Sequence, residues 1–280
     1  MPIQPATRIK IKTYLEDFID KLILKHAHST IPLFDDPASY LAQTSTKPEF
    51  KPFHAAAIPH EIMRISAVER SFSTSLGSSF EESARLIALD YHAEAKLRYD
   101  MSGEVSRRSL AAIDDAPVRF ENGSDLFNGE VDSPLSDLID DVLDAWDDRT
   151  LAPLQTRSDL YILTRDGQEL YFEIKSSVPN KGQCVNILRW ILRLHLLRRR
   201  KRPDVQAYLA MPYNPFGPTR ADYNWSVPQL YLPFDETVLI GHEFWELIGG
   251  PNTYEELLAI YHEVGQQKSQ HIIDVLKLRF

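Results

Sequence analysis

The spacing of apolar residues along the chain predicts five helices. In each of these segments the apolar side chains recur at intervals of three and four residues, which gathers them on one face of an α-helix. The segments are residues 8–27, 79–99, 135–147, 183–201 and 253–265. The second helix also has a predicted start, because residues 78–82 read Ser-Ser-Phe-Glu-Glu and contain capping-box sequences in two registers.

Shorter apolar segments predict strands. Residues 160–163 and 170–174 are rich in β-prone side chains, and the Asp166-Gly167 pair between them is a strong turn signal for a β-hairpin. Further strands are expected at 205–211 and 117–123, whereas residues 29–60, which hold five prolines, are expected to form loop with short helical turns. Helices alternating with strands predict an α/β fold, in one domain over residues 1–280 with a mixed central β-sheet flanked by helices.

The composition is that of an ordinary globular protein. The chain has 280 residues, of which 43% are apolar and 25% charged, enough for one domain with a full core. It has no run of about eighteen uncharged apolar residues and its start lacks the apolar core of a signal peptide, so no membrane partner is expected. The single cysteine, Cys184, excludes an internal disulfide and a cysteine zinc cluster, and we expect a cytoplasmic protein.

Charge is distributed unevenly along the chain. The net charge of −9 argues mildly against a nucleic-acid partner, because phosphates attract Lys and Arg. However, residues 121–148 hold ten acidic residues and no Lys or Arg, and residues 189–202 hold seven Lys or Arg and no acid. The basic run at 198–202 fits either a DNA clamp or a helix C-terminus that collects cations against its dipole. The net charge of the whole chain therefore does not exclude a nucleic-acid partner.

The sequence Glu-x-Lys occurs three times, beginning at Glu49, Glu94 and Glu173. The first lies in a proline-rich loop and the second in the middle of a predicted helix, so that only the third lies on a strand of the predicted hairpin. Residues two apart on a strand point to the same side, so Glu173 and Lys175 share a face. A turn centred on Asp166-Gly167 would pair Asp159 close to Glu173, which brings two carboxylates and one ammonium group together.

This grouping suits the hydrolysis of a phosphodiester. Two carboxylates can hold Mg²⁺ with part of its water shell, and the metal can activate a bound water. A lysine can position that water and stabilise charge on the phosphorane. An exposed hairpin face with an ordinary Lys–Glu pair would show the same spacing, and spacing alone does not separate the two interpretations.

The order of these residues resembles a known nuclease core. Ser158-Asp159, then Glu173-Ile174-Lys175, then a long helix and a strand, is similar to the PD-(D/E)XK superfamily, with Ser158 in place of the proline. Four longer blocks resemble type II restriction endonucleases of the TdeIII type. They are ERSFSTSLGSSFEESARLIA (69–88), YFEIKSSVPNKGQC (171–184), MPYNPFG (211–217) and IGHEFWELIGGPNTYEELLAIY (240–261).

The resemblance implies a Mg²⁺-dependent homodimeric endonuclease that cuts both strands of double-stranded DNA at a short palindrome, associated with GGNCC. A cognate DNA methyltransferase would protect the same site in the host. Residues 1–60 would be peripheral, 69–211 the catalytic core, and 212–280 a region for recognition or dimerisation. The alternatives are a repair nuclease or junction resolvase without sequence preference, and a DNA-binding protein without turnover.

The resemblance also implies roles for single residues. Asp159 and Glu173 would be metal ligands, and Lys175 would be the base that positions the water, or a charge stabiliser. Glu81 is the candidate for an additional metal ligand, but a capping-box glutamate would need no catalytic role, and Glu82 and Glu69 remain alternatives. Gln183, in the loop that opens the predicted helix 183–201, would orient the attacking water or contact the scissile phosphate, or else serve only as the start of that helix.

Several polar residues are candidates for DNA contacts. Some precede or begin a predicted helix, where phosphate binds well, and others lie in expected loops. Two arginines form a basic stripe on the predicted helix 183–201, which would face either DNA or the acidic helix 135–147. The candidates are Arg70, Ser71, Ser73, Thr74, Asn180, Lys181, Arg189, Arg193, Arg220 and Asn224. His242-Glu243 lacks the second histidine of HExxH, so no metal site is expected there.

Overall fold

The computed structural model describes residues 3–27, 53, 57–123 and 134–276. The chain divides into two compact units, one of residues 1–11 with 80–260 and one of residues 12–79 with 261–280. The expectation of a single domain over residues 1–280 stays a prediction. None of the helices in the described ranges is long and apolar enough to cross a membrane.

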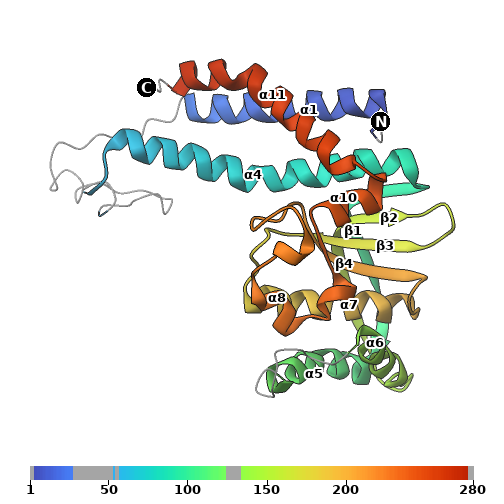
Figure 1. The fold of residues 1–280 in the computed structure, drawn as a ribbon. Coiled ribbons are helices and arrows are strands. Elements are labelled where there is room, and N and C mark those ends of the chain that lie inside the picture. The colour runs from blue at the N-terminus through green and yellow to red at the C-terminus, as the bar shows by residue number, and fades with distance from the viewer. Residues whose placement is uncertain (1–2, 28–52, 54–56, 124–133, 277–280) are drawn as a thin grey trace. The chain divides into compact units, whose positions relative to one another are not determined.

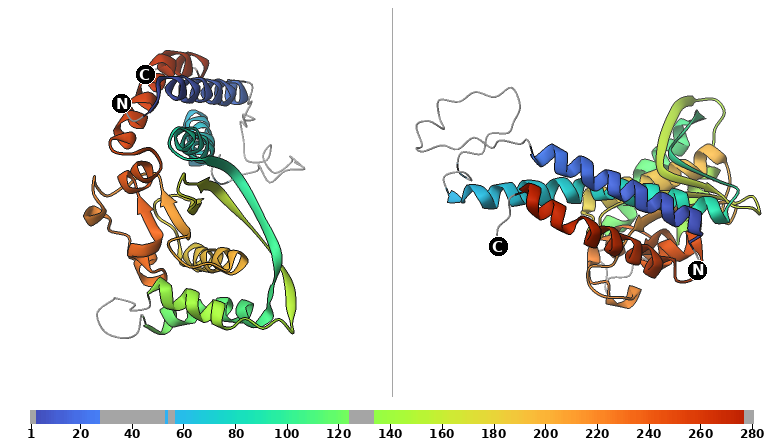
Figure 2. Two further views of the ribbon diagram at one scale, coloured as in Figure 1. Left: turned by 90° about the vertical axis from the view of Figure 1, so that its right-hand side faces the viewer. Right: turned by 90° about the horizontal axis from the view of Figure 1, so that it is seen from above.

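The first unit is built on a mixed five-stranded sheet, which confirms the predicted α/β class (Figure 1). The strands follow chain order in the sheet, with β1–β2–β3 antiparallel and β3–β4–β5 parallel. They are β1 (Glu94–Ser106), β2 (Leu151–Leu163), β3 (Glu169–Ile174), β4 (Val205–Met211) and β5 (Val238–Ile240). Figure 2 shows the long β1 and β2 extending past the shorter strands.

Helices cover both faces of the sheet because alternate residues of its inner strands are apolar on each side. Tyr171 of β3 is buried in the same core as Leu188 and Leu192, whereas Phe172 packs on Phe244 with ring centroids 5.5 Å apart. Helix α7 therefore lies on one face and α10 on the other (Figure 1). The helical elements of this unit after β1 are α5 (Arg107–Gly123), α6 (Leu135–Asp144), α7 (Lys181–Arg198), the short 3₁₀ turn η1 (Arg220–Asp222), α8 (Ser226–Tyr231), α9 (Phe234–Thr237) and α10 (His242–Gly249).

Three helices continue from one unit into the other. They are α1 (Pro5–Ala27), α4 (His60–Tyr91) and α11 (Thr253–Leu276). Within the second unit, α1 is joined to α11 by ion pairs of 2.5 Å between Lys12 and Glu263 and 2.7 Å between Lys268 and Asp20. The predicted helix at 8–27 is confirmed, and most of the predicted loop at 29–60 lies outside the described residues.

The predicted helix 79–99 was wrong at both ends. Helix α4 begins at His60, so Ser78 and Ser79 lie within it and cannot form a capping box at its start. It ends at Tyr91, and Glu94 begins strand β1. The apolar spacing continues past residue 91, but twelve residues of β1 pair with β2, and this long-range pairing overrides the local helical pattern.

The predicted strand 117–123 is the last part of helix α5, which contains Pro117. Ile113, Ala116 and Phe120 are buried at helical spacing against the core of the sheet. The free energy gained by burying that helix face outweighs the helix-breaking effect of Pro117 and the strand preference of the residues around it. The hairpin is confirmed, but β2 begins at Leu151, well before the predicted strand 160–163, because its first part pairs with β1. The strand at 205–211 and the helix at 183–201 are confirmed to within a few residues, while α11 extends beyond the predicted 253–265 to Leu276.

Candidate active site

The hairpin brings Asp159 and Glu173 together. The register pairs Leu160 with Phe172, so the next position along each strand sets Asp159 across from Glu173. The backbone N–H of Ile174 donates a hydrogen bond of 2.9 Å to Asp159 Oδ2, which fixes the aspartate at the end of the ladder. The geometry expected from the Asp166-Gly167 turn is therefore present.

Lys175 lies on the same side of β3 and joins both carboxylates. Its Nζ is 2.8 Å from Glu173 Oε1 and 3.5 Å from Asp159 Oδ2. All three side chains are partly buried, with between 21% and 35% of each exposed, so the charges interact more strongly than an exposed pair would. The group is accessible enough for a substrate to reach it.

Glu81 reaches the same cluster from α4. Burial raises the pKa of its carboxyl group, and the negative charges of Asp159 and Glu173 raise it further, while Arg98 and Lys175 act in the opposite direction. These charges influence Glu81 because the part of α4 that carries it lies near the hairpin residues. Because this glutamate is inside a helix and not at its start, the capping-box explanation for it is wrong.

The alternatives to Glu81 have other partners. Glu82 is bonded to Arg85, with 2.5 Å between Oε1 and Nη2, so its charge is neutralised on the helix itself. Glu69 belongs to the second unit and accepts a hydrogen bond of 2.6 Å from Ser73. Of the three glutamates, only Glu81 interacts with the hairpin carboxylates in the described residues.

The cluster holds an excess of negative charge. Burial and the neighbouring Asp159 raise the pKa of Glu173 despite its bond to Lys175. Burial lowers the pKa of Lys175, but Glu173 and Asp159 together outweigh that effect and leave it above its ordinary value. Three carboxylates around one ammonium group carry net negative charge when ionised, and oxygen ligands of this kind suit a hard dication. Asp159 and Glu173, with Glu81 near them, therefore supply the type of ligand that a divalent metal prefers.

A pocket of about 300 Å³ opens beside Glu173 and Lys175. Its other walls are polar, aliphatic and aromatic side chains of α7, together with one residue from β2. These are Arg157, Gln183, Asn186, Ile187 and Trp190. This volume is enough for part of a nucleotide, and Glu173 and Lys175 form one wall of the pocket.

The start of α7 is held by a reciprocal pair of hydrogen bonds. Asn180 Oδ1 accepts from the backbone N–H of Gln183 at 3.0 Å, and Gln183 Oε1 accepts from the backbone N–H of Asn180 at 2.8 Å. Gln183 thus caps the helix and lines the pocket at the same time, so the two interpretations of this residue do not exclude each other. Lys181 lies over the ring of Tyr231, with Nζ 5.0 Å from the centroid.

Two basic residues near the cluster were missed by the sequence reasoning. Arg157 lines the pocket and is held by two hydrogen bonds, of 2.7 and 2.8 Å, to Asp100 on β1. Arg98 lies in β1 across from Asp159 and has a left-handed backbone with φ of 51°. Arg157 precedes the predicted strand, and Arg98 fell within the predicted helix, so neither position suggested a place beside the site.

One arginine of the basic stripe on α7 has a partner within the protein. Arg189 pairs with Asp114 of α5 at 3.4 Å, and not with the acidic helix α6. It is instead Lys201 that reaches α6, at 2.5 Å from Asp140, and Arg199 lies 3.7 Å over the ring of Trp146. Arg193 is half-buried, and its role in DNA binding stays a prediction, as does that of Arg189.

Arg220 is the most extensively bonded of the DNA-binding candidates. Its guanidinium donates to Glu243 at 2.7 Å, to Asp235 at 3.1 Å and to the backbone oxygens of Phe234 and Val238. These bonds tie η1 to α9, β5 and α10, which gives Arg220 a structural role whatever else it does. Asn224 is exposed beyond η1.

Four other candidates lie in the second unit. Arg70, Ser71, Ser73 and Thr74 are part of helix α4, so the loop predicted for them was wrong. Thr74 donates to the backbone oxygen of Arg70 at 2.8 Å, and Ser71 accepts from Lys25 at 3.0 Å. Their contacts with DNA stay a prediction.

The comparisons with known proteins agree with this chemistry. The sequence model of the family described as "Type II restriction endonuclease, HinfI" matches residues 7–265. The chain is 42% identical over 276 residues to "Type II restriction enzyme HgiBI" and 43% identical over 276 residues to "Type II restriction enzyme HgiEI", both of Herpetosiphon aurantiacus. Each alignment covers 99% of both proteins. No solved structure shows significant similarity to the chain.

Proposed function

Because this chain belongs to the HinfI family of type II restriction endonucleases, we propose that its site-specific cleavage is carried out by Glu81, Asp159, Glu173 and Lys175 with Mg²⁺. The observation that carries the proposal is the convergence of three carboxylates and one lysine from α4, β2 and β3 beside an open pocket. The same hairpin supports placement of the chain in the PD-(D/E)XK superfamily.

The three carboxylates would hold the cation, which supplies polarisation of the scissile phosphate and a more acidic bound water. Lys175, held between Glu173 and Asp159, is positioned to donate a hydrogen bond to the attacking water. Without a metal, burial lowers the pKa of Lys175, but Glu173 and Asp159 outweigh this and raise it, so its ammonium group can donate a hydrogen bond and stabilise charge. Burial, and after it repulsion by the neighbouring carboxylates, raises the pKa values of Glu81 and Glu173, and a dication would relieve that repulsion.

We propose that Arg98 stabilises the negative charge that develops on the phosphate during cleavage. It is exposed, lies across from Asp159 and influences Glu81 electrostatically. Its left-handed backbone, at φ of 51°, is a conformation that costs energy in a non-glycine residue and is concentrated at functional sites. A preorganised cation of this kind favours the transition state over the ground state.

DNA would approach along the pocket and the start of α7. Asn180 and Lys181 lie at the N-terminus of that helix, where the dipole favours phosphate. Arg157 and Asn186 line the pocket beyond Glu173 and offer polar groups to a nucleotide, whereas Trp190, which also lines it, is largely buried and donates its indole N–H to the backbone oxygen of Arg157.

Cleavage of both strands at a palindrome requires two active sites related by two-fold symmetry, so we propose a homodimer. GGNCC is the target that the resemblance to the TdeIII type implies, and a cognate methyltransferase would act on the same sequence. A DNA substrate in the cell also supports the expected cytoplasmic location.

Digestion of a sequenced plasmid with Mg²⁺, beside a Lys175→Ala control, tests the proposal. Discrete fragments whose ends map to GGNCC, absent with Lys175→Ala and in EDTA, are the expected result. Fragments that map to another palindrome would keep the mechanism and reject GGNCC. Smearing would indicate a nuclease without sequence preference, and cleavage that survives Lys175→Ala would reject the assigned site.

A further inference from the structure

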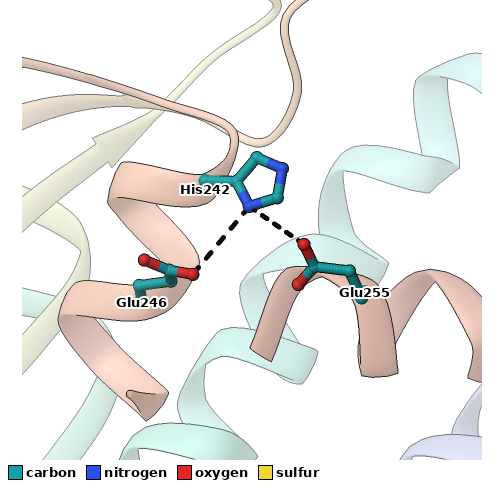
Figure 3. Close-up of side chains that lie close together, drawn as sticks. All are labelled: His242, Glu246 and Glu255. Atoms are coloured by element: carbon teal, nitrogen blue, oxygen red, sulfur yellow. Dashed lines mark ion pairs between the residues drawn. The ribbon is translucent and has the colours of Figure 1, made fainter. Parts of the chain in front are cut away.

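A second group of metal-ligating side chains lies where α10 is followed by α11. It consists of His242, Glu246 and Glu255, and none of these residues belongs to the elements that carry the proposed catalytic cluster (Figure 3). His242 Nδ1 is 3.4 Å from Glu255 Oε1 and 3.9 Å from Glu246 Oε1. The three potential ligand atoms all lie within 4.8 Å of one another.

The local fold brings these side chains together. Residues four apart share one face of a helix, so His242 and Glu246 lie one above the other on α10. The chain then reverses through Gly250 and Asn252, which have φ of 80° and 65°, and the first turn of α11 presents Glu255 to the same place. Figure 3 shows the imidazole between the two carboxylates.

The ligands are partly fixed in position before any ion binds. The backbone N–H of Asn252 donates to Glu246 Oε1 at 3.2 Å. The His242 ring packs edge-on against Tyr254, with centroids 4.5 Å apart. Because these contacts already restrict Glu246 and His242, an ion would lose less binding energy to the ordering of its ligands.

The distances suit a small tetrahedral cation. Ligand atoms about 2.0–2.1 Å from zinc are separated from one another by roughly 3.4 Å in a tetrahedron. The distance from His242 to Glu255 already has this value, and the distance from His242 to Glu246 exceeds it by about half an ångström. The ligand oxygens of Glu246 and Glu255 lie within 4.8 Å of each other. Small side-chain movements would complete three bonds and leave the fourth position to water.

The charge of the group also favours a cation. Within the described residues, His242 is the ion-pair partner of both Glu246 and Glu255, and no lysine or arginine pairs with either carboxylate. One imidazole cannot neutralise two carboxylates, so the group keeps a negative charge in either protonation state of the histidine. An imidazole ligand favours Zn²⁺ over Mg²⁺ or Ca²⁺, which prefer oxygen ligands alone.

We propose that His242, Glu246 and Glu255 form a second metal site, selective for Zn²⁺ over Mg²⁺, which ties α10 to the first turn of α11. The site stabilises the fold and takes no part in cleavage. It is therefore separable by mutation from the Mg²⁺ site of the acidic cluster.

Isothermal titration with ZnCl₂, in excess Mg²⁺ to occupy the acidic cluster, tests this on the full-length protein. The wild type is expected to bind one Zn²⁺ per chain and to unfold at a higher temperature with zinc than without it. His242→Gln and Glu255→Gln are each expected to weaken zinc binding at least about tenfold, since each removes a ligand. His262→Gln, an exposed histidine on α11, is the matched control and should bind zinc as the wild type does.

Two further measurements make the outcomes decisive. Circular dichroism and plasmid cleavage in Mg²⁺ should be unchanged in His242→Gln, which shows that the variant is folded. Zinc binding that is lost in Glu173→Gln and kept in His242→Gln would place the ion in the acidic cluster and overturn the proposal. Absence of zinc binding to the wild type would also overturn it and leave His242 as the centre of an ion-pair cluster only.

Discussion

Glu81 and Glu82 are neighbours on α4 with opposite surroundings, which makes them a matched pair for mutation. Glu81 lies among like charges, and burial together with Asp159 raises its pKa. Glu82 is bonded to Arg85 on the next turn of the same helix, at 2.5 Å. We expect Glu81→Gln to lose cleavage and gain stability, and Glu82→Gln to keep cleavage and lose a little stability.

The size of each effect follows from the surroundings of the side chain. Removal of one charge from a half-exposed cluster of like charges should stabilise the metal-free protein by about 0.5–1 kcal/mol after solvent screening. Loss of the Glu82–Arg85 pair should cost about 0.3–0.5 kcal/mol, as for other surface pairs one turn apart on a helix. Loss of Glu81 should slow cleavage roughly 10²–10³-fold, as for other single groups that stabilise transition-state charge.

The sign of the pH dependence follows from the raised pKa of Glu81. The folded protein binds this proton more tightly than the unfolded chain, so the wild type loses stability as pH rises from the unfolded pKa through the folded pKa. The gain from Glu81→Gln should therefore be complete above the folded pKa. It should vanish below the unfolded pKa, where the wild-type carboxyl group is protonated in both states.

Urea denaturation in EDTA at neutral and acidic pH measures the stabilities, and plasmid cleavage in Mg²⁺ measures the rates. A Glu81→Gln variant that is less stable than the wild type at neutral pH would refute the argument from repulsion. If Glu82→Gln lost cleavage while Glu81→Gln remained active, Glu82 and not Glu81 would be the additional metal ligand.

Three further changes test other contacts. Lys175→Met leaves Glu173 without its cation, so cleavage should fall roughly 10²–10³-fold. Urea denaturation of this variant in EDTA should show a loss of about 1–3 kcal/mol, less than for a fully buried pair, and an unchanged midpoint would contradict the pairing. Arg98→Gly and Arg98→Ala should both cleave DNA slowly. The glycine variant should be about 1 kcal/mol more stable than the alanine variant, because only glycine adopts the left-handed backbone without strain. Equal stabilities of the two variants would mean that the backbone is not strained. Arg220→Met leaves Glu243 unpaired and should cost about 2–4 kcal/mol in urea denaturation, whereas wild-type stability with relaxed site preference would support base reading by this arginine.

Much of the site could be predicted from the sequence because its central part is a hairpin. Asp159, Glu173 and Lys175 lie on two strands joined by a short turn, and a period of two with an Asp-Gly turn sets both register and face. The acidic helix α6, the helix α7 and the strand β4 are likewise local patterns, and the structure contains all three. The roles of these residues in catalysis stay a prediction.

The boundary between α4 and β1 could not be predicted. The apolar spacing of residues 79–99 fits a helix throughout, and only pairing with β2, more than fifty residues further along the chain, makes the second part a strand. The same error concealed Arg98 and suggested a helix start at Ser78. For the same reason the capping-box interpretation of Glu81 could be rejected only from the structure.

The sequence by itself determined the contacts between residues that are neighbours along the chain, because turn chemistry and the period of side chains fix those contacts locally. Tertiary structure decided which distant residues meet. It brought Glu81 to the hairpin, paired Arg189 with Asp114, and set Glu255 beside His242. Burial of apolar faces and long-range strand pairing bring these charges together, and neither leaves a local pattern in the sequence around them.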